Sequence, residues 1–350
     1  VKYLNSQNAQ VHVLSNRLPS YFDAGEFVFE QIDVQNKDSI LDYCRLHQIE
    51  LIYSVGSDFG LLTSSYVSEQ LGLKHFIPWQ TAVLFQNKKL FRQFITKQNI
   101  SLVQYKSSNK LVDFENWNIF PSVVKPADSQ GQRGVSIINK KDEFRESFKK
   151  ALSYSSINEV IVEEYIPGEE ISVNVFINEG RIDDFFITDR ILAQEINSGI
   201  PKRHIIPSSM PGNLISKIYS ITQKIIENTG INNGPVYLQM KYHKDQVEII
   251  EAAARLDGCH LWRLIEMYSG VNLLQKTIDK LLNKNNSSKT QEAETGKKMF
   301  IEFSLQKPGE DFVEEFLPSK YRIPYYKIGE TVTPVNGAFE KTIVHFCSEQ

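Results

Sequence analysis

The sequence has few cysteines, little net charge and no long apolar run. Its three cysteines, Cys44, Cys259 and Cys347, are far apart and odd in number. Neither a disulfide framework nor a zinc site is therefore expected, and a reducing cytoplasm is the default location. A formal net charge of −3 gathers neither nucleic acid nor anionic lipid. No apolar stretch reaches the roughly 18 residues of a membrane span, and no signal peptide is found. These absences favour a cytoplasmic protein that has neither nucleic acid nor a membrane as its partner.

The first part of the chain has an alternating pattern. At 350 residues there is room for two or three domains, and the sequence begins at Val1, so whether residues precede it stays open. Strand patterns occur at 10–15 and 49–55, and helix patterns at 37–47 and 58–71. Such alternation favours a parallel, doubly wound sheet, and we expect an N-terminal α/β domain over residues 1–83.

Beyond residue 83 the chain mixes helices with adjacent strands. Helical spacing of apolar residues occurs at 87–97, 142–152 and 213–228, and strand patterns at 159–164, 171–178, 181–187, 235–242 and 246–252. The stretch 284–298 is polar and has no periodicity, which indicates a loop or a boundary. We expect an α+β domain over 84–285 and a small β-rich C-terminal subdomain over 286–350.

The segment Val123–Val135 has features of a phosphate-binding loop. A buried strand delivers Lys125 at its end, and a loop containing Gly131 and Gly134 leads into the next strand. Glycines let backbone N–H groups converge on an anion, and the lysine adds a point charge for a phosphate oxygen. The Walker spacing is excluded, because the lysine precedes the glycines. The alternative is a surface hairpin with a solvated lysine.

The segment Val160–Val173 joins two apolar strands through paired acids and a Pro-Gly turn. The backbone at Glu164–Ile166 offers the C=O and N–H pair that an adenine ring needs. The Glu170 carboxylate is suited to accept from ribose hydroxyls. A solvated acidic hairpin is the alternative interpretation.

The third segment, Gly234–Gly258, is suited to hold a cation. Strand alternation puts Glu251 and Arg255 on one face with small alanines between them, provided that the strand persists. Gln239, on the neighbouring strand, adds a neutral oxygen. Magnesium takes few protein oxygens and completes its shell with water and substrate phosphate. The alternative is a salt bridge between Glu251 and Arg255.

Taken in this order, the three segments resemble the ATP-grasp superfamily over about residues 10 to 300. The resemblance is closest to carboxylate–amine (amino-acid) ligases and biotin-carboxylase-like enzymes. It implies a parallel N-terminal α/β domain, two α+β subdomains that clasp ATP with a hinge near 163–168, and a small β-rich C-terminal subdomain. The cofactors it implies are ATP and Mg²⁺, with Mn²⁺ as an alternative. Dimerisation is common among such proteins, so a homodimer stays open.

The resemblance also implies roles for residues in the nucleotide site. Lys88, with Lys89 as its competitor, matches the first nucleotide lysine, and Lys125 matches the second. The other implied contacts are Ser129, Gln130, Gly131 and Gly134 in the loop that closes over the phosphates, Glu163, Glu164 and Ile166 at the adenine hinge, and Glu170 at the ribose.

At the reacting end, Gln239 and Glu251 match the magnesium ligands, and Arg255 matches the arginine that steadies the acyl-phosphate. Lys125 and Arg255 are thus the implied catalytic residues. Two positions depart from the family pattern, which often has an acid at Gln239 and usually has asparagine at Ala253. One certain carboxylate remains, so the number and affinity of bound metal ions stay open.

The resemblance implies an ATP-dependent ligase that joins a carboxylate to an amine through an acyl-phosphate, with release of ADP and phosphate. A biotin-carboxylase-like enzyme that activates bicarbonate is one alternative. A non-catalytic ATP-binding protein with a weakened metal site is the other. Candidate substrate contacts are Arg190, Arg203, His204, His260 and Arg263. A cationic cluster of this kind suits an acidic substrate, and the alternative is ordinary surface charge.

Overall fold

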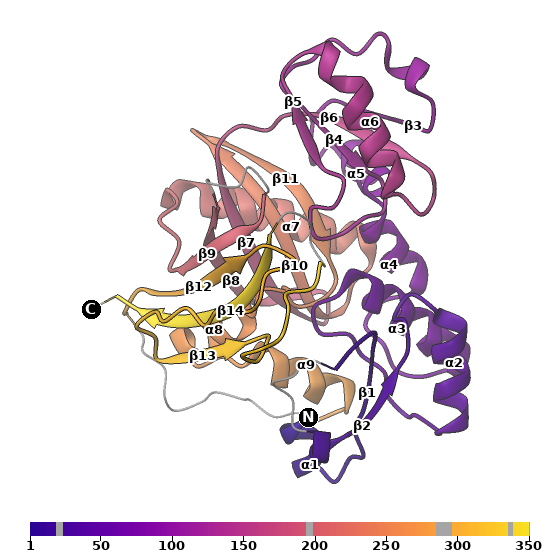
Figure 1. Cartoon of the computed structure of the whole chain (residues 1–350), viewed down its shortest axis with the longest axis vertical. Coiled ribbons are helices and arrows are strands. Elements are labelled where there is room, and N and C mark those ends of the chain that lie inside the picture. Colours follow the sequence, from indigo (N-terminus) through magenta and orange to yellow (C-terminus); the bar gives the residue numbers. More distant parts are fainter. Residues whose placement is uncertain (19–23, 194–198, 285–295, 335–338, 350) are drawn as a thin grey trace.

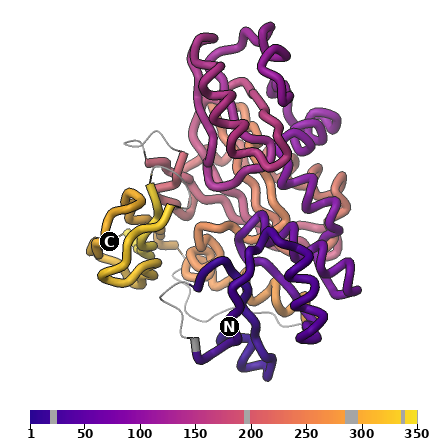
Figure 2. The backbone as a smooth tube through the Cα atoms, turned by 45° about the vertical axis from the view of Figure 1, so that its right-hand side comes forward, coloured from indigo at the N-terminus to yellow at the C-terminus, as the bar shows by residue number. Residues whose placement is uncertain are grey.

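The computed structural model describes residues 1–18, 24–193, 199–284, 296–334 and 339–349. A four-stranded sheet lies at one end of the molecule and the N-terminal segment at the other, with an eight-stranded sheet between them (Figures 1 and 2). The described helices include none that combines the length and hydropathy needed to cross a bilayer.

The N-terminal segment packs helices beside a two-stranded parallel sheet. Its elements are α1 (Lys2–Ser6), β1 (His12–Ser15), β2 (Val28–Gln31), α2 (Lys37–Leu46), α3 (Asp58–Leu71) and α4 (Trp79–Gln86). β1 pairs with β2 in parallel, as the alternating pattern predicts. The strand predicted at 49–55 is wrong, because the segment forms no ladder. Ile49 and Ile52 pack on the N-terminal core, so their apolar spacing indicated burial and not strand pairing.

Two helices in this region begin and end as their sequences predict. The Ser57 side chain accepts a hydrogen bond from the Gly60 N–H at 3.1 Å, and Gly72 ends α3 in the left-handed conformation. α5 (Lys88–Lys97) begins at Asn87, whose side chain accepts from the N–H groups of its first turn. This cap places two lysines at the start of the helix.

The four-stranded sheet is antiparallel and carries the glycine-rich loop. Its order is β3-β6-β4-β5, and its elements are β3 (Tyr105–Ser108), β4 (Ser122–Pro126), β5 (Ser136–Ile138), β6 (Val160–Glu164) and α6 (Phe144–Ser153). Phe144 and Phe148 of α6 pack on Val124 and Val162 of the sheet. The loop between β4 and β5 is therefore anchored at both ends in a well-packed sheet.

The eight-stranded sheet has the order β11-β10-β7-β8-β9-β12-β14-β13. Its strands are β7 (Glu169–Asn178), β8 (Arg181–Leu192), β9 (Pro201–Ile206), β10 (Asn233–His243), β11 (Gln246–Ala253), β12 (Met299–Gln306), β13 (Tyr321–Pro324) and β14 (Glu340–Ser348). The associated helices are α7 (Ile215–Thr229), α8 (Leu261–Ser269) and α9 (Leu273–Leu281). The C-terminal strands continue this sheet, because β12 pairs with β9. Most of the polar stretch expected at 284–298 lies outside the described residues.

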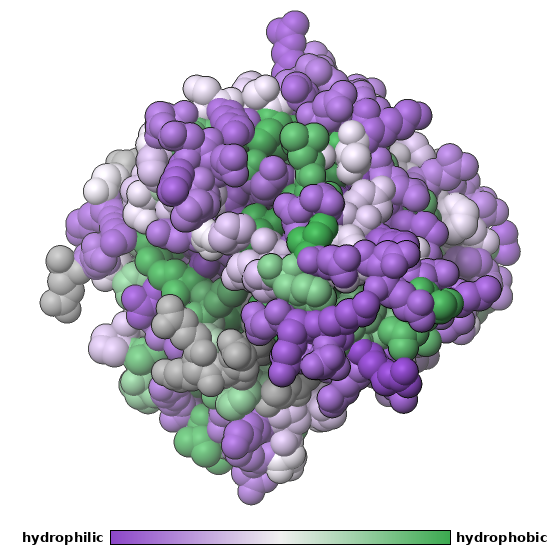
Figure 3. Space-filling view, turned by 90° about the horizontal axis from the view of Figure 1, so that it is seen from above, coloured by the Kyte–Doolittle hydropathy of each residue, from purple (hydrophilic) through white to green (hydrophobic). Residues whose placement is uncertain are grey.

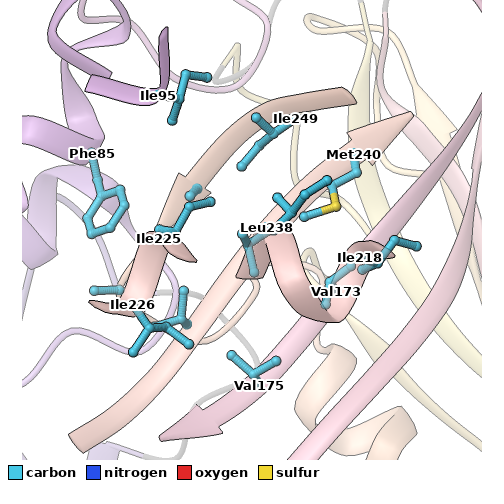
Figure 4. Close-up of a cluster of buried hydrophobic side chains, with 14 of the residues drawn as sticks. Phe85, Ile95, Val173, Val175, Ile218, Ile225, Ile226, Leu238, Met240 and Ile249 are labelled. Atoms are coloured by element: carbon cyan, nitrogen blue, oxygen red, sulfur yellow. The ribbon is translucent and has the colours of Figure 1, made fainter. Parts of the chain in front are cut away.

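The two faces of the large sheet differ in chemistry. On one face, Val173 and Val175 of β7 pack against α4, α5 and α7, as Figure 4 shows. On the other face, β7 presents Glu170, Ser172 and Asn174, all buried or nearly so. On the face seen from above, hydrophilic side chains predominate, with apolar residues between them (Figure 3). A buried polar face of this kind is unusual and indicates a functional region.

Candidate active site

A buried network of charges joins the two sheets. Arg92 of α5 is 1 % exposed and binds both Glu163 carboxylate oxygens, through Nε at 3.0 Å and Nη2 at 3.1 Å. Lys125 of β4 donates to Glu163 at 2.7 Å. Arg92 also donates through Nη1 to the Ile249 carbonyl of β11 at 3.3 Å. One guanidinium therefore holds the small sheet against the large one.

The electrostatics of this network favour an ionised carboxylate. Burial would raise the pKa of the Glu163 carboxyl, but the charges of Arg92 and Lys125 outweigh burial and lower it to about 2. For Lys125, burial lowers the pKa of the ammonium group more than Glu163 raises it. An anion arriving at Lys125 would favour its charged form, which suits a lysine that binds phosphate.

The two lysines at the start of α5 have different partners. Lys88 donates a short hydrogen bond to the Ser129 carbonyl of the glycine-rich loop, and its N–H donates to the Ala127 carbonyl at 2.7 Å. Lys89 pairs with Glu159 at 2.6 Å. Lys88 thus lies against the loop, whereas Lys89 is neutralised next to it, which favours Lys88 for a role at phosphate.

Asp128 holds the glycine-rich loop in place. Its carboxylate accepts from the Ser155 hydroxyl at 2.7 Å and from the N–H groups of Ser156 and Ile157 at 3.0 and 3.2 Å. Gly131 and Gly134, as predicted for a tight loop, have positive φ. A side chain at Gly134 would also meet Pro126 at 2.8 Å, so glycine is required there.

The predicted adenine hinge lies at the end of β6, an inner strand of the small sheet. The Glu164 N–H donates to the Gln104 carbonyl at 3.0 Å, and the Ile166 carbonyl accepts from Lys241 at 3.1 Å. The Ile166 N–H takes part in neither bond. A hydrogen-bonding role of this backbone toward adenine stays a prediction.

Glu170, predicted to contact ribose, is surrounded by three side chains. Arg190 donates to it at 3.0 Å and Gln239 Nε2 at 2.8 Å, and Lys241 lies 3.6 Å away. Its side chain is 10 % exposed. In this arrangement Glu170 orients Arg190 and Gln239, and a contact with ribose needs one of these bonds to open.

Gln239 and Glu251 are direct partners across β10 and β11. Because the Gln239 NH₂ group donates to Glu170, its amide oxygen is left for another ligand. The Glu251 carboxylate is partly buried and forms no ion pair with any residue the structure describes. Two hard oxygen donors suit Mg²⁺ that shares its shell with phosphate. The described residues contain no cluster of three His, Cys, Asp or Glu, so they do not form a complete metal cage.

Arg255 lies just beyond the end of β11 and is held by the N-terminal segment. Its Nε and Nη2 contact Asp58 Oδ1 at 2.7 and 2.6 Å, and Nη1 donates to the Leu256 carbonyl at 2.9 Å. The Arg255 side chain is 8 % exposed. Burial would lower its pKa, but Asp58 and nearby carboxylates raise it. The salt bridge between Arg255 and Glu251, offered as an alternative from the sequence, is absent among the described ion pairs.

Two of the predicted substrate contacts lie on or beside the buried polar face. His204 of β9 is the register partner of Arg190 and is fully buried. The His260 Nε2 atom lies 2.8 Å from the Tyr325 hydroxyl. Burial, followed by the charge of Lys341, lowers the pKa of the His260 imidazole to about 4. Burial, followed by the charges of Arg190 and Lys341, also lowers the pKa of the His204 imidazole. Both imidazoles are therefore neutral near pH 7.

Two other predicted substrate contacts have partners elsewhere. Arg203 binds Glu302 and lies over the Phe300 ring at 4.6 Å. Arg263 pairs with Glu266 at 2.5 Å one helical turn away, and its side chain is 41 % exposed. The structure does not bring these two arginines into the set around Arg190.

Sequence reasoning missed Arg92 and Asp58. Arg92 carries a detectable signal, because it lies between Phe91 and Ile95 on the predicted inward face of a helix. An arginine in such a position requires a buried acid. Asp58 lies in the first turn of α3, where acidic residues are common because they stabilise the start of a helix. The local sequence therefore does not indicate that it binds Arg255.

Comparisons with known proteins bear on the family and the fold of this chain. Residues 118–261 match the model of the ATP-grasp domain. The D-alanine–D-alanine ligase of Geotalea uraniireducens is 28% identical over 147 residues, which cover 39% of this chain and 45% of that ligase. The dapdiamide A synthase of Enterobacter agglomerans is 22% identical over 292 residues, covering 78% of this chain and 68% of the synthase. The match to the first of these relatives thus spans less than half of its length.

Solved structures show the same fold over the whole chain. The L-amino acid ligase from Bacillus licheniformis superposes with a TM-score of 0.80 at 17% identity, covering 99% of this chain and 89% of that one. The phosphoribosylglycinamide synthetase from Anaerococcus prevotii has a TM-score of 0.72 at 16% identity, covering 99% and 90%. The ATP-grasp fold predicted from the order of the three motifs is confirmed, and residues 118–261 match the ATP-grasp domain.

Proposed function

We propose that this protein is an ATP-dependent carboxylate–amine ligase that acts through an acyl-phosphate and releases ADP and phosphate. The observation that carries the proposal is the position of Arg92. It binds Glu163 beside Lys125 on one side and the Ile249 carbonyl on the other, two residues before Glu251. The phosphate lysine and the metal carboxylate are thereby held on facing sheets, as phosphoryl transfer requires.

In the proposed reaction, the substrate carboxylate attacks the γ-phosphorus of ATP, which gives an acyl-phosphate and ADP. Lys88 and Lys125 neutralise phosphate oxygens as charge moves toward the leaving ADP. The amine then attacks the acyl carbon, loses a proton and expels phosphate. Arg255 stabilises the oxyanion of the tetrahedral adduct. The loop anchored by Asp128 excludes water, which would otherwise hydrolyse the intermediate.

Gln239 and Glu251 would hold Mg²⁺ through their side-chain oxygens. When bound, the ion neutralises phosphate charge and orients the γ-phosphate. The neutral amide at Gln239 supplies less charge than a second carboxylate would. We therefore expect the ion to depend on the nucleotide for much of its shell, and to bind weakly to the protein alone.

The substitution Glu251→Gln tests this site. It removes the one metal carboxylate and preserves side-chain size, so we expect kcat for ADP release to fall by about 10²–10³-fold. The Mg²⁺ concentration needed for half-maximal ATP binding should rise, which calorimetry measures without turnover. Glu302→Gln is the matched control, because that carboxylate binds Arg203 away from the site. A Glu251→Gln enzyme with wild-type kcat and Mg²⁺ dependence would refute the metal assignment.

The reaction class is tested by measuring ADP release with paired panels of carboxylates and amines. Mass spectrometry identifies the products. The expected result is release that requires both an acid and an amine. Release that depends on bicarbonate alone would instead favour a carboxylase. ATP binding without release across the whole panel would favour a non-catalytic protein.

A further inference from the structure

The buried polar face of the large sheet contains more hydrogen-bonding capacity than its protein partners use. Register pairing places Ser172 beside Thr188 and Arg190 beside His204, all on the face that presents Gln239. Among the described residues, the hydroxyls of Ser172 and Thr188 and both ring nitrogens of His204 have no partner. All three residues are fully buried. Such groups each cost about 1–3 kcal/mol when unpaired, so each of them needs a partner from buried water or a bound ligand.

A cation from the C-terminal strand lies at the border of this region. Lys341 of β14 donates to Cys259 Sγ at 3.0 Å and lies over the Phe303 ring at 4.2 Å. No carboxylate in the described part of the chain lies within ion-pair distance of it. Its charge acts on both His204 and Cys259, and so does the charge of Arg190. The charges of Lys341 and Arg190 therefore act on the same two side chains.

The two nearby carboxylates, Glu170 and Asp257, already have hydrogen-bonding partners. Glu170 is shared by Arg190, Lys241 and Gln239. Asp257 accepts from the Cys259 N–H at 2.5 Å. The two carboxylates of this region, Glu170 and Asp257, face three cations, Arg190, Lys241 and Lys341. The balance of charge around His204 is therefore positive and favours an anion.

We propose that Lys341, together with Arg190, Ser172 and Thr188, forms a subsite for a negatively charged group that one small-molecule substrate carries in addition to the reacting carboxylate or amine. The inference rests on the proposed ligase function and narrows its substrate class to compounds such as dicarboxylates or phosphorylated amino acids. Lys341 comes from the C-terminal strands, so these strands take part in selecting the substrate.

Matched substrates that differ by one charge test the subsite. Glutamate is compared with glutamine, and phosphoserine with serine. Each compound is supplied first as the carboxylate substrate and then as the amine substrate, and kcat/KM is measured from ADP release. A charge-assisted hydrogen bond contributes about 1.5–3 kcal/mol, so a preference of about 10–100-fold for the anionic member is expected. A stronger preference in the glutamate comparison indicates that the subsite binds a carboxylate, and a stronger preference in the phosphoserine comparison indicates a phosphate.

Lys341→Met keeps the contact with Phe303 but removes the charge. It should abolish this preference by raising KM for the anionic substrate, with kcat nearly unchanged, and Lys341→Arg should restore the preference. Lys307→Met is the matched control, since Lys307 also lies over a phenylalanine ring, Phe339, at 5.9 Å but is exposed. A Lys341→Met enzyme that keeps the wild-type preference would overturn the subsite, as would a wild-type enzyme that prefers the neutral members.

Direct binding separates failure of the subsite from failure of the ligase function. Calorimetry with glutarate, glutamate and phosphoserine needs no turnover, and Lys341→Met should weaken binding at least tenfold while its thermal unfolding midpoint stays close to that of the wild type. If anions bind in this way but no pair of substrates elicits ADP release, the ligase function is wrong and the anion subsite stands. If no anion binds, or Lys341→Met binds as tightly as wild type, the subsite is wrong.

Discussion

Replacing Glu163 by glutamine is expected to lower the free energy of unfolding by about 3–5 kcal/mol, because it leaves Arg92 and Lys125 buried without their counterion. ATP affinity should fall at least tenfold, since Glu163 also fixes the position of the Lys125 ammonium group. Urea unfolding measures the first effect. Calorimetric titration with ATP measures the affinity, in buffer without urea and at a temperature where the variant is folded.

The control for this prediction is Glu159→Gln. Glu159 also binds a lysine, Lys89, but its side chain is more exposed than that of Glu163. Ion pairs at the surface contribute about 0–1 kcal/mol, and this partly exposed pair is closer to that case than Glu163 is, so the control should lose less stability. Equal losses in the two variants would show that the Arg92–Glu163–Lys125 network has no special role.

The same prediction has a pH dependence. The pKa of the Glu163 carboxyl is lowered from 4.5 to about 2 in the folded protein. Its contribution is therefore fully present above the unfolded value near 4.5 and is lost as the pH falls toward 2. The stability difference between wild type and Glu163→Gln should narrow over that range. A difference that stays constant from pH 7 to pH 3 would contradict the assignment.

Arg255→Met is expected to lower kcat for ligation by about 10²–10³-fold while leaving ATP affinity and stability nearly unchanged. The reason is that Arg255 lies just past the end of β11 and contacts Asp58 and the Leu256 carbonyl, whereas the two lysines lie on α5 and β4. Its main partner Asp58 is partly exposed. The loss should appear in kcat and in kcat/KM alike, because the interaction forms as the oxyanion develops.

Asp58→Asn separates the chemistry of Arg255 from its positioning. The guanidinium charge remains, and only the contacts at 2.7 and 2.6 Å are weakened. We expect a decrease in kcat much smaller than that of Arg255→Met. Comparable decreases in both variants would indicate that Arg255 supports the interface with α3 and takes no direct part in the reaction.

Local patterns predicted much of the fold, because they report directly on local physics. The helix 58–71 has a serine cap and a terminal glycine, and the hairpin around Glu179 and Gly180 has a turn between two apolar runs. The segment 49–55 failed because apolar spacing shows that a segment is buried without showing whether it finds a strand partner. The C-terminal strands were expected as a small β-rich subdomain. The pairing of β12 with β9, which joins these strands to the large sheet, depends on long-range contacts that no local pattern contains.

The site was predictable in its types of residue and less so in its contacts. The alternation of β10 and β11 and the order of the motifs led to Gln239 and Glu251, which the register makes direct partners. The resemblance matched Glu163 to the adenine hinge, and nothing in the sequence indicated that its carboxylate binds two cations. That arrangement depends on Arg92, which is 71 residues away in sequence. Lys341 is further still from Cys259, at 82 residues, so neither contact could be found without the fold.

The most direct test of the central claim is the fate of oxygen in the acid substrate. A carboxylate labelled with ¹⁸O at both oxygens is supplied with ATP, Mg²⁺ and the amine identified from the panels. It should transfer one labelled oxygen to each phosphate released. That transfer requires the carboxylate to attack the γ-phosphorus, and mass spectrometry of the phosphate detects it. Phosphate that contains no label from the acid would contradict activation through an acyl-phosphate.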